Sequence, residues 1–143
     1  MKIIVGTDHA GVKAKQKIVE WLKKNNYNVE DVGSFDQKAP DDYPDFAKKV
    51  VRKVKGTNNK GVLICTTGTG MVIAANRFKG IRASLAYDKY SAVMSRRDNN
   101  ANVLTLRAKG YSARKHIGLI KIWLNTPFSN QARHKRRVKK LDK

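Results

Sequence analysis

The clearest evidence for the fold class is the stretch Val62-Leu63-Ile64-Cys65-Thr66-Thr67-Gly68-Thr69-Gly70. Its first four residues form an unbroken apolar run, which is typical of a strand buried on both faces of a parallel sheet. The two glycines predict a loop after this strand, and the apolar residues that follow predict a helix at 71–77. A buried strand, a loop and a helix form the repeating unit of α/β proteins.

The same change from short apolar runs to helical periods recurs on both sides of this stretch. We predict strands at residues 3–6, 28–32, 62–65, 81–86 and 103–106. The predicted helices cover residues 12–24, 44–54 and 71–77, then a helix capped by Asp88 that runs to 97, one capped by Ser112 that runs to 124, and a basic helix at 130–141. The predicted fold class is therefore α/β: a Rossmann-like three-layer sandwich with a five-stranded parallel sheet and an extra C-terminal helix, in a single domain over residues 1–143.

The composition is that of one folded domain with a strong positive charge. The chain has 143 residues, of which 41% are hydrophobic, and 31 Lys and Arg against 11 Asp and Glu give a formal net charge of +20. The apolar runs are far shorter than the roughly 18 residues that suggest a membrane span, so a membrane protein is excluded. Because the sequence begins without the apolar region of a secretory signal and has a single cysteine, Cys65, we expect a cytoplasmic protein.

The positive charge suggests nucleic acid as a binding partner, because clustered Lys and Arg neutralise phosphates. The basic residues are spread over every segment, however, and form only one dense run, at 133–140. There is no zinc-finger spacing and no aromatic-rich RNA-binding signature. We interpret Trp21, Trp123 and Tyr90 as core residues, because they stand among apolar residues at helical spacing. Most of the charge is therefore predicted to be solvated surface, with a basic nucleic-acid-binding protein as the alternative function.

Three loops beside the predicted strands carry chemically active side chains. They are residues 6–11 after the first strand, 65–70 after the third, and 98–102 before the fifth. In a doubly wound sheet the ligand lies beyond the carboxyl ends of the strands. We therefore expect these loops to form the site.

Two of these loops resemble nucleotide-binding motifs without completing them. Residues 6–11 have the glycine spacing of a phosphate loop, but Val12 and Lys13 follow where Lys and then Ser or Thr are required. Residues 68–70 resemble the start of a dinucleotide fingerprint, but Ile73 occupies the position of its third glycine. The loops still offer backbone N–H groups that can hold an anion or stabilise an oxyanion.

The candidate functional side chains each have a plain structural alternative. Cys65 is either a buried small hydrophobic residue or a thiolate favoured by the helix that begins after it. His9, next to Asp8, is either structural or an anion-binding or acid–base residue. Arg133 and Arg137 share one helix face and are either part of a solvated tail or a clamp for one phosphate.

Together these motifs resemble the type B ribose-5-phosphate isomerases, a family shared with the galactose-6-phosphate isomerase subunits of the lactose pathway. The resemblance covers nearly the whole chain. It rests on Gly6-x-Asp8-His9-Ala10-Gly11, Asp42-Tyr43-Pro44-Asp45-Phe46-Ala47, the Cys65 loop with Ile73-Ala74-Ala75-Asn76, Gly80-Ile81-Arg82-Ala83, Asn102-Val103-Leu104 and Arg133-His134-x-x-Arg137-Val138.

The resemblance implies an aldose–ketose isomerase that acts on a sugar phosphate through an enediolate, without metal or cofactor. It implies an active site between the two subunits of a homodimer and leaves open whether dimers pair into tetramers. The implied catalytic residues are Cys65, as the base that moves a proton between C2 and C1, with Thr67 and Asp98. The implied substrate-binding residues are Asp8, His9, Tyr43, Gly68, Thr69, Gly70 and Asn99. The implied phosphate-binding residues are His9, Lys109, Arg133 and Arg137.

Three positions depart from the family pattern. Thr66 replaces a glycine, Lys109 replaces an arginine that the partner subunit lends to the phosphate, and Asp98 replaces a histidine credited with opening the furanose ring. Either Asp98 serves ring opening, as a general base or through a raised pKa, or the chain uses galactose or allose 6-phosphate or needs a second subunit type. We favour ribose 5-phosphate, because the loop that ends at Gly11 and the terminal Arg-His motif are similar to the ribose branch.

Overall fold

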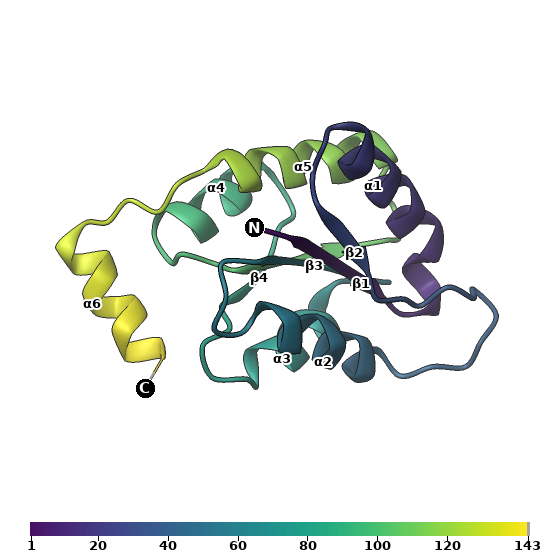
Figure 1. Ribbon diagram of the computed structural model, residues 1–143, viewed down its shortest axis with the longest axis horizontal. Coiled ribbons are helices and arrows are strands. Elements are labelled where there is room, and N and C mark those ends of the chain that lie inside the picture. Colours follow the sequence, from purple (N-terminus) through teal and green to yellow (C-terminus); the bar gives the residue numbers. More distant parts are fainter. Residues whose placement is uncertain (143) are drawn as a thin grey trace.

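The computed structural model describes residues 1–142 and contains a five-stranded sheet (Figure 1). The strands are β1 (Ile3–Thr7), β2 (Val29–Asp31), β3 (Lys60–Cys65), β4 (Ala83–Leu85) and β5 (Val103–Arg107). They lie in the order β2-β1-β3-β5-β4, and all neighbouring pairs are parallel. The predicted five-stranded parallel sheet is confirmed.

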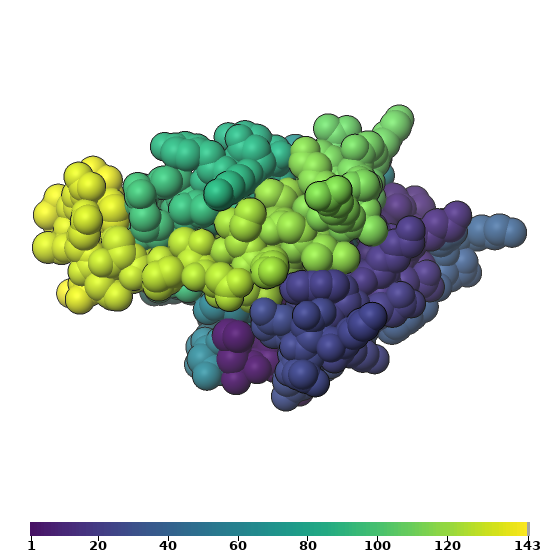
Figure 2. Space-filling view, turned by 90° about the horizontal axis from the view of Figure 1, so that it is seen from above, coloured from purple at the N-terminus to yellow at the C-terminus, as the bar shows by residue number. Residues whose placement is uncertain are grey.

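Helices cover both faces of this sheet. They are α1 (Val12–Lys24), α2 (Tyr43–Val54), α3 (Thr69–Asn76), α4 (Lys89–Arg97), α5 (Ala113–Asn125) and α6 (Ala132–Leu141). Figure 1 shows α1, α4 and α5 on one face and α2 and α3 on the other, whereas α6 projects away from the sheet. The view from above in Figure 2 shows the same C-terminal segment, in yellow, protruding at one end of the molecule. The three-layer sandwich with an extra C-terminal helix is therefore confirmed. Within residues 1–142 no helix is long and apolar enough to cross a membrane.

Strand β3 has buried side chains on both of its faces, as its apolar run predicts. Val62 and Ile64 pack in a cluster with Trp123 of α5, and Leu63 and Cys65 pack in a second cluster with α2 and α3. Successive side chains of a strand point to opposite faces, which explains this alternation. The side chain of Cys65 is therefore directed to the α2 and α3 side of the sheet.

The observed elements differ from the predicted ones mainly at their ends. β4 begins at Ala83 rather than at residue 81, because the N–H of Arg82 donates to the side chain of Asn102 (2.8 Å). α3 begins at residue 69, directly after Gly68, which has a φ of +83° and serves as the N-cap. The 3-10 helix η1 (His9–Gly11) has no counterpart in the prediction.

The aromatic residues that we interpreted as core divide into three cases. Trp123 is fully buried, and Trp21 is partly buried against the same cluster. Tyr90 is 70% exposed, so its assignment to the core is wrong. It lies in the first turn of α4, and this helix turns Ala92 and Ser95 toward the sheet, on another face from Tyr90.

Gly11 provides a test of the packing between η1 and β3. A Cβ atom at this position would overlap the Thr7 hydroxyl and lie 2.8 Å from Cγ2 of Ile64. We expect Gly11→Ala to lower the free energy of unfolding by about 1–3 kcal/mol, as overpacking does. The matched control is Gly118→Ala in α5, where a Cβ would have no heavy atom within 4 Å; it should raise stability by about 0.5–1 kcal/mol. Urea unfolding followed by circular dichroism measures the stability of both variants. If Gly11→Ala and Gly118→Ala proved equally stable, the close packing around Gly11 would be contradicted.

Candidate functional site

The loops after β1, β3 and β5 meet at one edge of the sheet, because these strands are parallel neighbours. The N–H of Ala108 donates to the carbonyl of Cys65 (2.8 Å), and the N–H of Lys109 donates to the carbonyl of Thr66 (3.2 Å). β1 pairs with β3 along its whole length, from Ile3 to Thr7. We call this edge, where the carboxyl ends of the strands lie, the carboxyl edge. It places Lys109 beside Thr66 of the same chain.

Cys65 ends β3 and is only 5% exposed. The backbone N–H of Gly68 donates a hydrogen bond to its Sγ (3.1 Å). An N–H directed at the sulfur, at the start of a helix, stabilises negative charge there. Gly68 reaches this position with a left-handed φ, and a Cβ atom on it would lie 2.5 Å from Cδ1 of Leu85. The local geometry therefore suits a cysteine that acts as a thiolate.

Tyr43 and the glycine loop are in contact. Tyr43 is the first residue of α2, and a Cβ atom on Gly70 would lie 2.9 Å from its ring. The hydroxyls of Thr67 and Thr69 are hydrogen-bonded to each other (2.7 Å). The structure thus brings Tyr43 and residues 67–70 together, as expected of residues that serve one ligand.

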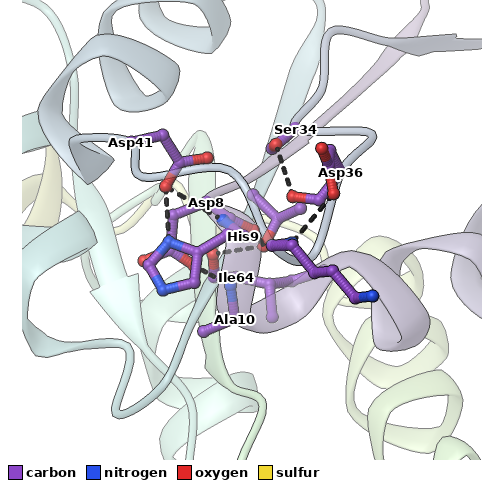
Figure 3. A network of polar contacts seen from close by, with 9 residues as sticks. Asp8, His9, Ala10, Ser34, Asp36, Asp41 and Ile64 are labelled. Atoms are coloured by element: carbon purple, nitrogen blue, oxygen red, sulfur yellow. Dashed lines mark hydrogen bonds and ion pairs between the residues drawn. The ribbon is translucent and has the colours of Figure 1, made fainter.

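Asp8 and His9 follow β1, and a third residue, Asp41, joins them (Figure 3). The Asp8 carboxylate accepts a hydrogen bond from the N–H of Ala10 (3.1 Å), and burial raises the pKa of Asp8. Oδ1 of Asp41 accepts from both the ring Nδ1 (2.6 Å) and the backbone N–H (3.1 Å) of His9. The hydrogen bond to Asp41 raises the pKa of His9. Sequence reasoning missed Asp41, whose only signal was its place in a polar loop before α2.

An open pocket of about 320 Å³ adjoins the carboxyl edge on the side of α1 and α5. Lys13 and Lys17 of α1 line it, together with Lys109, Thr66 and the buried His116. The lining residues within 1–142 include no acidic side chain. This excess of positive charge attracts small anions to the edge that carries His9.

The remaining predicted site residues lie elsewhere in the chain. They are Asp98, Asn99, Arg133 and Arg137. Asp98 follows the last residue of α4; its Oδ1 accepts from Nε of Arg97 (2.9 Å) and lies 3.8 Å from Nδ1 of His134 in α6. Asn99 lines a pocket of about 330 Å³ with Leu141 of α6. α4 and α6 thus gather these four residues into a second group.

This second group lies at the opposite edge of the sheet, so residues 98–102 do not join the other two loops at the carboxyl edge of the same chain. The chain enters β5 at Val103, after residues 98–102, and leaves it at Arg107, beside Cys65. The two groups are therefore separated by the length of β5, roughly 16 Å for five residues. In Figure 1 α6 correspondingly lies on the far side of the molecule from the loop between β2 and α2.

The environment of Asp98 within the chain favours one of the two forms of ring-opening chemistry that the sequence left open. The hydrogen bond from Arg97 lowers the pKa of Asp98, and the positive charge of Arg133 acts in the same direction. Within this chain the surroundings of Asp98 thus lower its pKa and do not raise it. An ionised carboxylate accepts protons, so a role for Asp98 in ring opening is that of a general base.

The chain is similar to known proteins in both sequence and structure. A family model described as Ribose/Galactose Isomerase matches residues 3–141. The chain is 40% identical over 141 residues to the probable ribose-5-phosphate isomerase B of Mycoplasma genitalium, which covers 97% of this chain and 92% of the relative. Its structure is similar to that of the ribose 5-phosphate isomerase of Thermotoga maritima, with a TM-score of 0.94, 40% identity and coverage of 99% and 97%. It is also similar to the ribose-5-phosphate isomerase B of M. genitalium with bound ribulose-5-phosphate, with a TM-score of 0.94, 38% identity and coverage of 99% and 93%. From the family match and these relatives we conclude that the chain belongs to the ribose/galactose isomerase family.

Proposed function

We propose that the chain is an aldose–ketose isomerase that interconverts ribose 5-phosphate and ribulose 5-phosphate, with residues 1–143 as its single domain. The observation that carries the proposal is the glycine loop, in which the N–H of Gly68 faces the sulfur of Cys65 while Tyr43 packs on Gly70. The family match supports the same class of reaction. The lone Cys65 is in keeping with our prediction of a cytoplasmic enzyme.

The reaction requires one base and a stabiliser for a negatively charged oxygen. The Cys65 thiolate takes the proton from C2, and the electron pair left behind forms the C1–C2 double bond of an enediolate. The same group then returns the proton to C1, while a proton moves from the C2 hydroxyl to the C1 oxygen with help from Thr67. N–H groups of residues 68–70, in the first turn of α3, stabilise the enediolate oxygen.

The polar residues of the carboxyl edge have complementary tasks. Asp8 and Tyr43 hold sugar hydroxyls near the glycine loop. His9 and Lys109 hold the phosphate, for which the lysine-lined pocket provides a positive field. We assign Lys109 to the site of its own chain, and not to that of the partner as the resemblance implies, because it lies beside Thr66. The raised pKa of His9 favours its cationic form, which binds a phosphate dianion more strongly than the neutral ring does.

A second copy of the chain completes the site in this proposal. Asp98, Asn99, Arg133 and Arg137 lie at the other edge of the sheet and cannot reach Cys65 of their own chain. In a two-fold symmetric homodimer each chain gives this group to its partner and receives the same group in return. The projecting α6 supports such an exchange (Figure 1). Whether dimers pair into tetramers stays a prediction for measurement in solution.

The role of Cys65 is tested by Cys65→Ala. We expect turnover of ribose 5-phosphate to fall by about 10²–10⁴-fold, the contribution of a positioned base, while circular dichroism stays unchanged. A coupled assay that follows ribulose 5-phosphate measures this, with Gly118→Ala as the active control. The wild-type protein should act on ribose 5-phosphate faster than on galactose or allose 6-phosphate. A fully active Cys65→Ala variant would remove Cys65 as the base.

The shared site is tested by mixing two defective variants, Cys65→Ala and Arg137→Ala. After joint refolding, half of the dimers are mixed, and each mixed dimer has one site with both defects and one with neither. Activity should therefore return to about a quarter of the wild-type value. Native mass spectrometry verifies that mixed dimers form. Mixed dimers without recovered activity would show that each site lies within one chain.

The role of position 98 is tested by Asp98→His. A histidine can both donate and accept a proton near neutral pH, whereas the ionised Asp98 only accepts. We expect the variant to raise turnover of ribose 5-phosphate, which is mostly a closed furanose ring. The measurement is kcat in the coupled assay at pH 7. A turnover that is unchanged or lower would contradict the assignment of ring opening to this position.

A further inference from the structure

Asp41 makes two hydrogen bonds to a single residue of the proposed phosphate site. Its Oδ1 lies 2.6 Å from the ring Nδ1 of His9 and 3.1 Å from the backbone N of the same residue. The Asp41 side chain is 13% exposed, whereas that of His9 is 45% exposed. Figure 3 shows Asp41 above the imidazole ring, with its carboxylate directed at the ring. A largely buried carboxylate therefore holds a histidine whose ring reaches solvent.

The direction of these hydrogen bonds determines which nitrogen of the His9 ring carries a proton. An ionised carboxylate only accepts hydrogen bonds, so Nδ1 of His9 carries a proton. Nε2 remains for a ligand, and it is a donor when the ring is cationic. Although burial alone would raise the pKa of Asp41, the hydrogen bonds from His9 keep it below its ordinary value. Two charged groups face His9, Asp41 and Asp8, and both raise the pKa of the ring.

We propose that Asp41 is a positioning residue that orients His9 and keeps its imidazole in the doubly protonated form that binds the substrate phosphate. The proposal rests on the proposed function for the identity of the ligand, but the state of His9 can be measured without any substrate. Asp41 does not touch the sugar in this account, and it acts only through His9. It belongs neither to the residues that the sequence motifs indicated nor to the second group at the far edge.

The competing explanation is that Asp41 merely fastens the loop of residues 33–42. This loop has other anchors in its first turn, since the N–H of Thr7 donates to the carbonyl of Gly33 (2.6 Å) and the N–H of Ser34 donates to the carbonyl of Thr7 (2.5 Å). The two explanations predict opposite orders for the pKa of His9 in two variants. If Asp41 acts through its charge, Asp41→Asn changes this pKa more than Asp41→Glu does; if Asp41 only fastens the loop, Asp41→Glu changes it more. Asp41→Asn keeps the shape and one acceptor oxygen but loses the charge, whereas Asp41→Glu keeps the charge and changes the shape.

The decisive experiment is an NMR titration of the His9 ring in the protein without substrate. The signal is assigned by its loss in His9→Asn, and Asp42→Asn is the matched control, since Asp42 is exposed and next in the chain. In Asp41→Asn we expect the pKa of His9 to fall by about one unit, with little change in Asp42→Asn and a partial return in Asp41→Glu. An unchanged His9 titration in Asp41→Asn would overturn the proposal.

Measurements of phosphate binding test the effect of Asp41 on function. His9 loses its positive charge as the pH rises through the pKa of its ring. If that pKa is lower in Asp41→Asn, the affinity for phosphate decreases at a lower pH than in the wild-type protein. We expect the dissociation constant of inorganic phosphate and the KM of ribose 5-phosphate to rise about tenfold at pH 7, with kcat within about twofold. A fall in kcat with unchanged KM would contradict the proposal. If the protein proves inactive on ribose 5-phosphate, the proposed function fails, while the titration and the phosphate binding still decide the role of Asp41.

Discussion

The parallel arrangement of β1, β3 and β5 is the constraint on which the rest of the structure depends. Each strand leaves the sheet at the same edge, so His9, Cys65 and Lys109 meet although they are far apart in the sequence. The same rule sends the residues that precede β5 to the other edge, and Asp98 is therefore kept away from Cys65. A short loop cannot span the length of β5, roughly 16 Å. In the proposed function each chain therefore contributes one of these groups to each of two sites, which is why we propose symmetric association.

The net charge of +20 is distributed in a way that fits this division. At the carboxyl edge the lysines of the open pocket have no acidic neighbour in its lining within residues 1–142. Two of the acids at this edge, Asp8 and Asp41, face His9 instead. Both acids raise the pKa of His9 and so favour a cationic ring, whose free Nε2 can donate to a phosphate. Acidic residues can therefore strengthen a phosphate site when a histidine lies between them and the ligand.

The fold could be predicted from the sequence because the signals are local. The apolar run at 62–65 and the helical periods fix the element order, and Asp88 and Ser112 act as the predicted N-caps. Contacts between distant segments were not predictable in this way. Asp41 meets His9 across 32 positions through an irregular loop without periodicity. Tyr90 was misplaced because an aromatic residue near a helix start has no local sign of which face it occupies. The residues of 98–102 were assigned to the wrong edge because a motif shows chemistry without showing on which side of a strand it lies.

The three departures from the family pattern are not independent of this geometry. Thr66 and Lys109 are neighbours, joined by a backbone hydrogen bond of 3.2 Å, and both line the open pocket. Replacing a glycine and an arginine there by threonine and lysine is therefore a change in one place, which keeps the positive charge and adds a hydroxyl beside it. Asp98 lies at the other edge, where Arg97 donates a hydrogen bond to it and compensates its charge. A carboxylate stabilised in this way is a base and not an acid. If ring opening in the homodimer uses this residue, the proton donor has to be another group, because an ionised Asp98 only accepts protons.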